Sequence, residues 1–144
     1  MPLFRSAVVF DTARVNEQRP FMSNTTSTLA IAALFLVAGI GHFVIPAWFD
    51  RIVPTWIPNP RLATYVSGVA EIAGALGVLY APTRRAAGIG LIALLVAVYP
   101  ANINMLQMAR ASAASSTMYL TILWLRLPLQ PLMVWWVYGA AVRR

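Results

Sequence analysis

The chain has 144 residues, of which 60% are hydrophobic and 10% charged, and its mean hydropathy is +0.70. A soluble domain of this size carries more polar surface, so the composition indicates an integral membrane protein. The formal net charge is +7, and every basic residue is an arginine. These arginines are dispersed at the ends of apolar segments and form no basic face, which argues against nucleic acid as a partner. Cysteine is absent, which excludes disulfides and thiolate chemistry.

Residues 1–24 contain no sustained apolar stretch and are expected to form a flexible or interfacial tail. They do not resemble a signal peptide, because no apolar run follows the first arginine. Met22 opens the segment MSNTTSTLA, which reads as an alternative start. The tail is therefore either native or an upstream extension, and residues 25–144 are expected to form a single membrane domain.

Four apolar segments follow the tail, each near the roughly 20 residues that cross about 30 Å of hydrocarbon. They cover residues 26–45, 62–81, 86–108 and 118–142. The segments are continuous and rich in Ala and Leu, without two-residue alternation, which favours helices over strands. The sequence therefore predicts an all-α fold, an integral membrane antiparallel four-helix bundle, with the bilayer as its main partner.

The connector between the first two segments, residues 46–61, reads PAWFDRIVPTWIPNPR and holds four prolines and two tryptophans. Proline ends helices and tryptophan favours the membrane–water boundary, so the connector is expected to lie along the interface. Seven arginines flank the segments on the side of the termini and three on the other side, or four against three without residues 1–21. This distribution predicts that both termini are cytoplasmic.

The segment WLRLPLQP, residues 124–131, places Arg126 inside an apolar run. Its guanidinium stays protonated, and a charge within a membrane span usually has a partner. Glu71 lies nine residues into the second segment and Arg126 nine residues after Thr117, so counting predicts that both lie about 13 Å below the same boundary. We therefore predict a Glu71–Arg126 ion pair, which either locks the helices together or lines a binding pocket.

Other polar residues are expected in the same half of the membrane. The candidate ligand-binding pocket consists of His42, Glu71, Asn102, Arg126 and Gln130. For His42 the alternative is a hydrogen-bonded residue near the interface, and for Asn102 and Asn104 it is interhelical contact. One histidine, one carboxylate within the spans and no cysteine are too few ligands for a metal site. No catalytic residue is identified. Close helix packing is expected along a stripe of small residues: Ser67, Ala70, Gly74 and Gly77.

Several of these motifs occur in order along the chain. They are GIGHF (39–43), the proline-rich connector, SGVAEIAGALGVL (67–79), YPANINM (99–105) and WLRLPLQPLMVWW (124–136). In these motifs, over residues 31–139, the sequence resembles the DoxX-like family of small four-helix membrane proteins. The resemblance implies the bacterial inner membrane and an association with membrane oxidoreductases or stress-defence enzymes, and it supplies no catalytic residues or cofactor motif.

Three functions are compatible with these observations. The first is an accessory or scaffold subunit of a membrane redox or stress-defence assembly, with a redox protein as its partner. The second is a quinone-binding subunit of an oxidoreductase, with quinone as the one cofactor that the polar residues suit. The third is a small-solute transporter, which would need a homo-oligomer because four helices leave little room for alternating access. The chain carries no self-sufficient redox equipment, which favours the first function and a role without catalysis.

Overall fold

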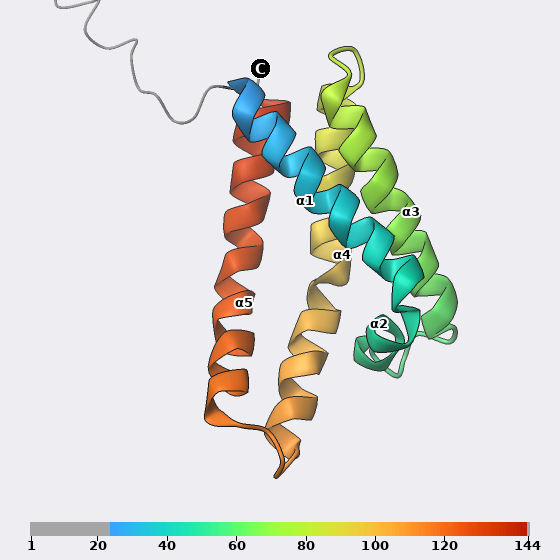
Figure 1. Cartoon of the computed structure of the whole chain (residues 1–144), viewed down its shortest axis with the longest axis vertical. Coiled ribbons are helices and arrows are strands. Elements are labelled where there is room, and N and C mark those ends of the chain that lie inside the picture. The colour runs from blue at the N-terminus through green and yellow to red at the C-terminus, as the bar shows by residue number, and fades with distance from the viewer. Residues whose placement is uncertain (1–23, 144) are drawn as a thin grey trace, which may run out of the picture.

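The structure, a computed structural model, describes residues 24–143 (Figure 1). The described part of the chain is all-α and contains no strand. Its helices are α1 (Asn24–Val44), α2 (Pro46–Ile52), α3 (Pro60–Leu79), α4 (Arg84–Ala111) and α5 (Thr117–Val137), which continues as the π-helical turn η2 (Tyr138–Val142). The long helices begin and end within three residues of the predicted apolar segments, and the predictions for residues 1–23 lie outside the described residues.

Within residues 24–143, four helices are long and apolar enough to cross a membrane: α1, α3, α4, and α5 together with η2. Their outward surfaces are apolar, as Val37 on α1 and Val69 on α3 illustrate. Such helices bury their backbone polar groups internally, which is what a bilayer requires. The chain is therefore a multi-pass membrane protein by the length and composition of its helices.

The close approach of α1 and α3 depends on two glycines. A Cβ atom at Gly68 would lie 2.7 Å from Cβ of His42 and 3.1 Å from the carbonyl oxygen of Gly39. A Cβ atom at Gly39 would lie 2.9 Å from the carbonyl oxygen of Gly68. The two backbones are thus in contact at this crossing, as small residues permit in membrane helices.

The contact of α3 with α4 depends on the predicted stripe of small residues. Gly74 packs directly against the buried side chain of Leu91, and a Cβ atom at Gly77 would lie 2.7 Å from that of Ala87. Two members of the stripe therefore face α4. The stripe did not include Gly68, which faces α1 from the neighbouring side of the same helix.

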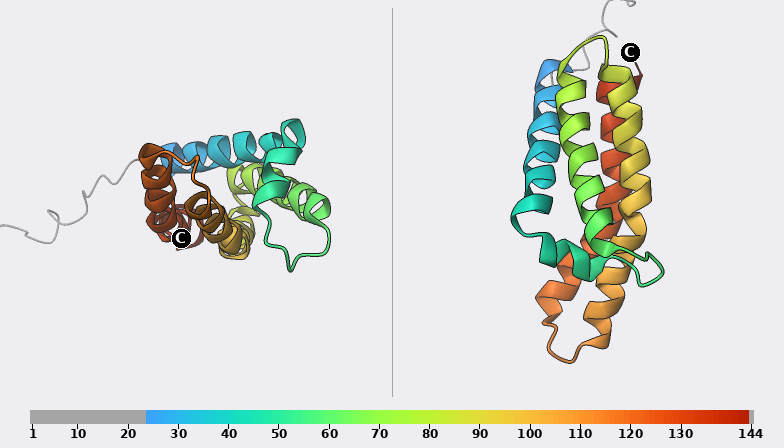
Figure 2. Two further views of the ribbon diagram at one scale, coloured as in Figure 1. Left: turned by 90° about the horizontal axis from the view of Figure 1, so that it is seen from below. Right: turned by 90° about the vertical axis from the view of Figure 1, so that its right-hand side faces the viewer.

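The pair α4 and α5 extends beyond α2 at the end where the two helices are joined (Figure 2). The reason is length, since α4 has 28 residues and α3 has 20. α5 packs against α4, whereas α1 reaches η2 at the opposite end. We call residues 105–125 the α4–α5 extension.

Buried apolar side chains form two separate clusters. The larger joins α1, α3, α4, the end of α5 and η2, and includes Ile31, Phe35, Val78, Leu91, Val137 and Ala141. The smaller lies in the α4–α5 extension, where Met105, Leu106, Ala109 and Leu123 pack together with Ile52 of α2 against them. The space between the clusters is where the polar residues gather.

The crossing of α1 and α3 yields a first prediction. Gly68→Ala should lower the free energy of unfolding by about 1–3 kcal/mol, the usual cost of overpacking, because the new methyl group meets His42 Cβ and a backbone oxygen. Unfolding in mixed micelles with increasing SDS would measure it. Gly90→Ala is the matched control, because nothing lies within 4 Å of a Cβ there, and it should leave stability equal or slightly higher. Equal behaviour of the two variants would show that the crossing is not tight.

Candidate functional site: an intramembrane cavity

A cavity of about 500 Å³ lies between the two apolar clusters and is lined by residues of all five α-helices. Phe35 and Leu95 of the larger cluster border it on one side and Ile52 on the other. All five predicted pocket residues line it: His42 of α1, Glu71 of α3, Asn102 of α4, and Arg126 and Gln130 of α5. The structure thus brings the predicted residues to one cavity, and ligand binding there remains a prediction.

The most buried polar contact in the cavity joins α1 and α3. His42 Nε2 and Glu71 Oε2 are 3.4 Å apart, and the two residues are 8% and 9% exposed. His42 also stacks on Phe49, with 3.8 Å between ring centroids. Although the pair is at ion-pair distance, neither His42 Nδ1 nor Glu71 Oε2 has a hydrogen-bond partner among the described residues. These two atoms are fully buried, while both residues line the cavity.

The predicted Glu71–Arg126 ion pair is wrong. Among residues 24–143, Glu71 contacts His42, and the guanidinium of Arg126 has no ion-pair or hydrogen-bond partner. Arg126 does line the cavity, but its side chain is exposed. Arg126 therefore borders the expected cavity, but it does not contact Glu71.

The physical reason is that the helices do not begin at a common level. The hydroxyl of Thr64 donates to Asp50 Oδ1 of α2 at 2.7 Å, so Thr64 is level with α2. Glu71 lies seven residues further along α3, about 10 Å deeper at 1.5 Å per residue. Counting from the first residue of each helix misplaced the pair, because α5 begins well beyond the start of α3 (Figure 2).

Side-chain hydrogen bonds fix the height of Arg126. Asn102 Nδ2 donates to Gln130 Oε1 at 2.6 Å, which places these residues level with each other. Asn104 Nδ2 donates to the carbonyl oxygen of Ile52 at 3.0 Å, so Asn104 is level with the connector. Arg126 precedes Gln130 by four residues, about 6 Å toward the α4–α5 extension. It therefore lies at the level of the connector or slightly beyond it.

Gln130 joins α4 and α5 through both ends of its amide. Its Oε1 accepts from Asn102, and its Nε2 donates at 2.6 Å to the carbonyl oxygen of Leu95. Pro100 has no N–H for the carbonyl oxygen of Val96, so the amide of Gln130 donates to the carbonyl next to the one that Pro100 leaves without its helical partner. Asn102 and Asn104 thus make the interhelical contacts that the sequence offered as their alternative, and Asn102 also borders the cavity.

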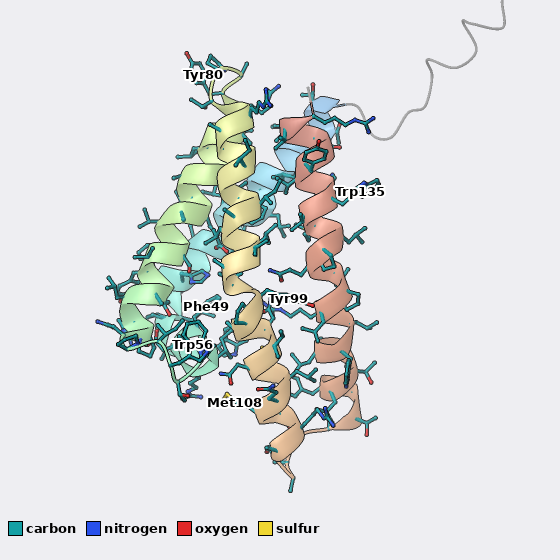
Figure 3. The ribbon with its side chains drawn as sticks, turned by 180° about the vertical axis from the view of Figure 1, so that it is seen from behind. Phe49, Trp56, Tyr80, Tyr99, Met108 and Trp135 are labelled. Carbon is teal, nitrogen blue, oxygen red and sulfur yellow. The ribbon has the colours of Figure 1, made fainter. Side chains whose placement is uncertain are left out.

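The connector closes one end of the cavity, and sequence analysis missed this role. Its apolar side chains line the wall there: Phe49, Ile52, Val53, Pro54, Trp56 and Ile57. Figure 3 shows Phe49 and Trp56 close together beside the lower half of α4. The prolines and tryptophans of this segment indicated the interface, but nothing in their spacing showed that it folds back beneath the helices.

Asp50 holds the connector on α3. Its Oδ1 accepts from the hydroxyl of Thr64, and its Oδ2 accepts from Arg61 Nε at 2.7 Å. The hydrogen bond from Thr64 and, to a smaller extent, the contacts with Arg61 hold the pKa of Asp50 below its usual value of 3.8. The carboxylate is therefore charged, and the contact intact, throughout the neutral range.

A family model described as a domain of unknown function (DUF8561) matches residues 31–141. No curated protein and no solved structure matches the chain.

The correction at Glu71 can be tested by double-mutant cycles. Glu71→Gln combined with His42→Gln should show a coupling energy of about 0.5–3 kcal/mol, as residues in contact do. Glu71→Gln combined with Arg126→Gln should show a smaller coupling, because these side chains are not in contact. Unfolding of the single and double variants in mixed micelles measures both energies, and a larger coupling to position 126 would restore the original pairing.

The contact of Asp50 predicts a pH dependence. A carboxyl group whose pKa is lowered by folding contributes stability above its ordinary pKa and loses that contribution as the pH falls through the lower, folded-state value. Asp50→Asn should therefore lower the melting midpoint at pH 7, and the difference from the wild type should shrink below about pH 4. Thr64→Val should reproduce part of the effect at pH 7. A difference that is constant from pH 7 to pH 3 would contradict the assignment.

Proposed function

We propose that this chain, which belongs to the DUF8561 family, is an accessory subunit of a membrane-associated redox or stress-defence assembly. Its own task there is to hold a lipophilic small molecule by its polar end. The observation that carries the proposal is the cavity of about 500 Å³ with polar side chains in an otherwise apolar wall. Ligand sites have this volume and this composition, with a few polar groups that orient the ligand.

The type of assembly rests on the resemblance of these motifs to the DoxX-like family, some members of which are associated with membrane oxidoreductases. In this proposal the four long helices form an antiparallel bundle across a bacterial inner membrane. Both termini are cytoplasmic, because more arginines flank the helices on the side of the termini than on the opposite side. The connector and the α4–α5 extension then face the outer side.

The polar residues divide between two walls of the cavity. His42 and Glu71 approach it from α1 and α3, and Asn102, Arg126 and Gln130 from α4 and α5. Glu71 and Asn102 are buried, whereas Arg126 is exposed. A ligand with a polar end and an apolar body fits this distribution, because the remaining wall is built of residues such as Phe35, Leu95 and Met133.

A quinone-binding subunit is the second candidate function, and the His42–Glu71 contact favours it. Reduction of a quinone to a quinol takes two electrons and two protons. The protons would reach a quinone oxygen by way of His42 and Glu71, which line the cavity and lie 3.4 Å apart. The electrons would come from the partner subunit, since the described chain offers no cluster of metal ligands.

Purification from native membranes tests the proposal. The protein in mild detergent should retain a lipophilic molecule, detectable by mass spectrometry of the extract, and should reproducibly bring down a redox or stress-defence protein. Ala101→Phe should abolish retention of the small molecule, because Ala101 lines the cavity and a phenyl ring would fill part of it.

Ala93→Phe is the matched control, since Ala93 lies on the same helix, is exposed and does not line the cavity. It should retain the molecule as the wild type does. A protein that retains nothing and stays alone in mild detergent would overturn the proposal. Retention of a quinone that is lost in Ala101→Phe would favour the second candidate over the first.

A further inference from the structure

Arg126 is a charged side chain for which the described part of the chain supplies no counter-ion. The only carboxylates within residues 24–143 are those of Asp50 and Glu71, and both are engaged elsewhere, by Arg61 with Thr64 and by His42. Arg126 is exposed on an apolar helix, among exposed apolar side chains such as Leu125 and Leu129. An arginine in such a place calls for an external acceptor, and its planar guanidinium matches phosphate and carboxylate oxygens.

The height of Arg126 restricts the chemistry of that acceptor. The hydrogen bonds of Asn102 and Asn104 place Arg126 level with the connector. The connector carries Trp48 and Trp56, both exposed, and the exposed Arg61. Tryptophan and arginine side chains favour the boundary between hydrocarbon and head groups. In the proposed membrane placement, with the connector at the interface, Arg126 is at the level of the lipid phosphates and the cavity extends from it toward the membrane interior.

Side chains that line the cavity from α1 and α5 are also exposed, such as Leu34 and Arg126. α5 packs on α4. α1 packs on η2, at the end of α5 that is far from Arg126, and it does not pack extensively on α5 itself. Figure 1 shows α1 and α5 diverging toward the level of α2.

From these observations we infer that the cavity takes a phospholipid, with its phosphodiester on Arg126 and one acyl chain running between α1 and α5. The chain would lie against Phe35 and Met133, deeper in the membrane than Arg126. The inference rests on the proposed function, because it names the class of the lipophilic molecule. It places the lipid in the same orientation as the surrounding leaflet, with the head group at the connector.

Photocrosslinking tests this assignment. The delipidated full-length protein is incubated with phosphatidylglycerol that carries a diazirine in one acyl chain, or with diacylglycerol bearing the same chain and no phosphate. Phosphatidylglycerol should crosslink to cavity residues such as Phe35 and Met133, and diacylglycerol about tenfold less, since one charge-assisted contact is lost. Equal labelling by the two lipids would overturn the inference, whatever the stability of any variant.

Variants then identify the residue that holds the phosphate. Arg126→Gln should lower labelling by phosphatidylglycerol about tenfold, to the level of diacylglycerol. Arg110→Gln should leave it unchanged, because Arg110 is exposed on α4 and does not line the cavity. Arg126→Lys, which keeps the charge, should retain more labelling than Arg126→Gln. Full labelling of Arg126→Gln would overturn the assignment.

Other outcomes separate the inference from its premise. If a diazirine fatty acid labels the cavity as strongly as phosphatidylglycerol, the acceptor is a carboxylate and the phospholipid is excluded. If the native protein retains a neutral molecule that Ala101→Phe loses, the proposed function stands without the phospholipid. If nothing is retained or crosslinked, both fail.

Discussion

The arrangement of the site depends on the contact between the backbones of α1 and α3. At this crossing Gly39 and Gly68 meet without intervening side chains. The nearness of the helices brings the end of α1 against the middle of α3, and His42 thereby reaches Glu71. Because α1 ends there, the chain turns at once into α2, and Phe49 stacks on the imidazole. One close approach therefore positions the buried polar pair and the connector beneath it.

A second constraint comes from the length of α4. Its 28 residues carry the start of α5 beyond the connector, so that Arg126 is level with α2 while Glu71 lies deeper. The two long helices are held in this register by Gln130, which joins Asn102 to the carbonyl oxygen of Leu95. The offset separates the polar groups of α5 from those of α3, and the cavity occupies the space that a direct ion pair would have closed.

Much of the fold could be predicted from the sequence. Hydropathy located the four long helices, because continuous apolar segments of sufficient length have few other solutions in a membrane. The convergence of His42, Glu71, Asn102 and Gln130 on one cavity also followed from a physical rule, since polar groups in apolar helices turn away from lipid. Arg126 borders the same cavity but is exposed. These inferences needed only the composition and approximate position of each residue.

The contacts within the site could not be predicted in the same way. Pairing Glu71 with Arg126 assumed that depth can be counted from helix ends, which fails when one helix is longer than its neighbour. Gly68 was missed because a stripe along one face of α3 does not show that a neighbouring face meets a second helix. The connector was missed as a cavity wall because its position depends on Asp50 and Asn104, whose partners are distant in sequence.

The divergence of α1 from α5 has a consequence for any measurement of affinity. A molecule that reaches the cavity sideways is drawn from a two-dimensional reservoir, so occupancy follows its mole fraction in the leaflet and not its aqueous concentration. An abundant membrane lipid then saturates the cavity even if the protein prefers it only weakly. A scarce lipid must be preferred more strongly, in proportion to how rare it is in the leaflet. The bound molecule exchanges with others by diffusion in the plane of the leaflet. The selectivity of the protein is therefore the ratio of its affinities for the molecules that compete within that leaflet.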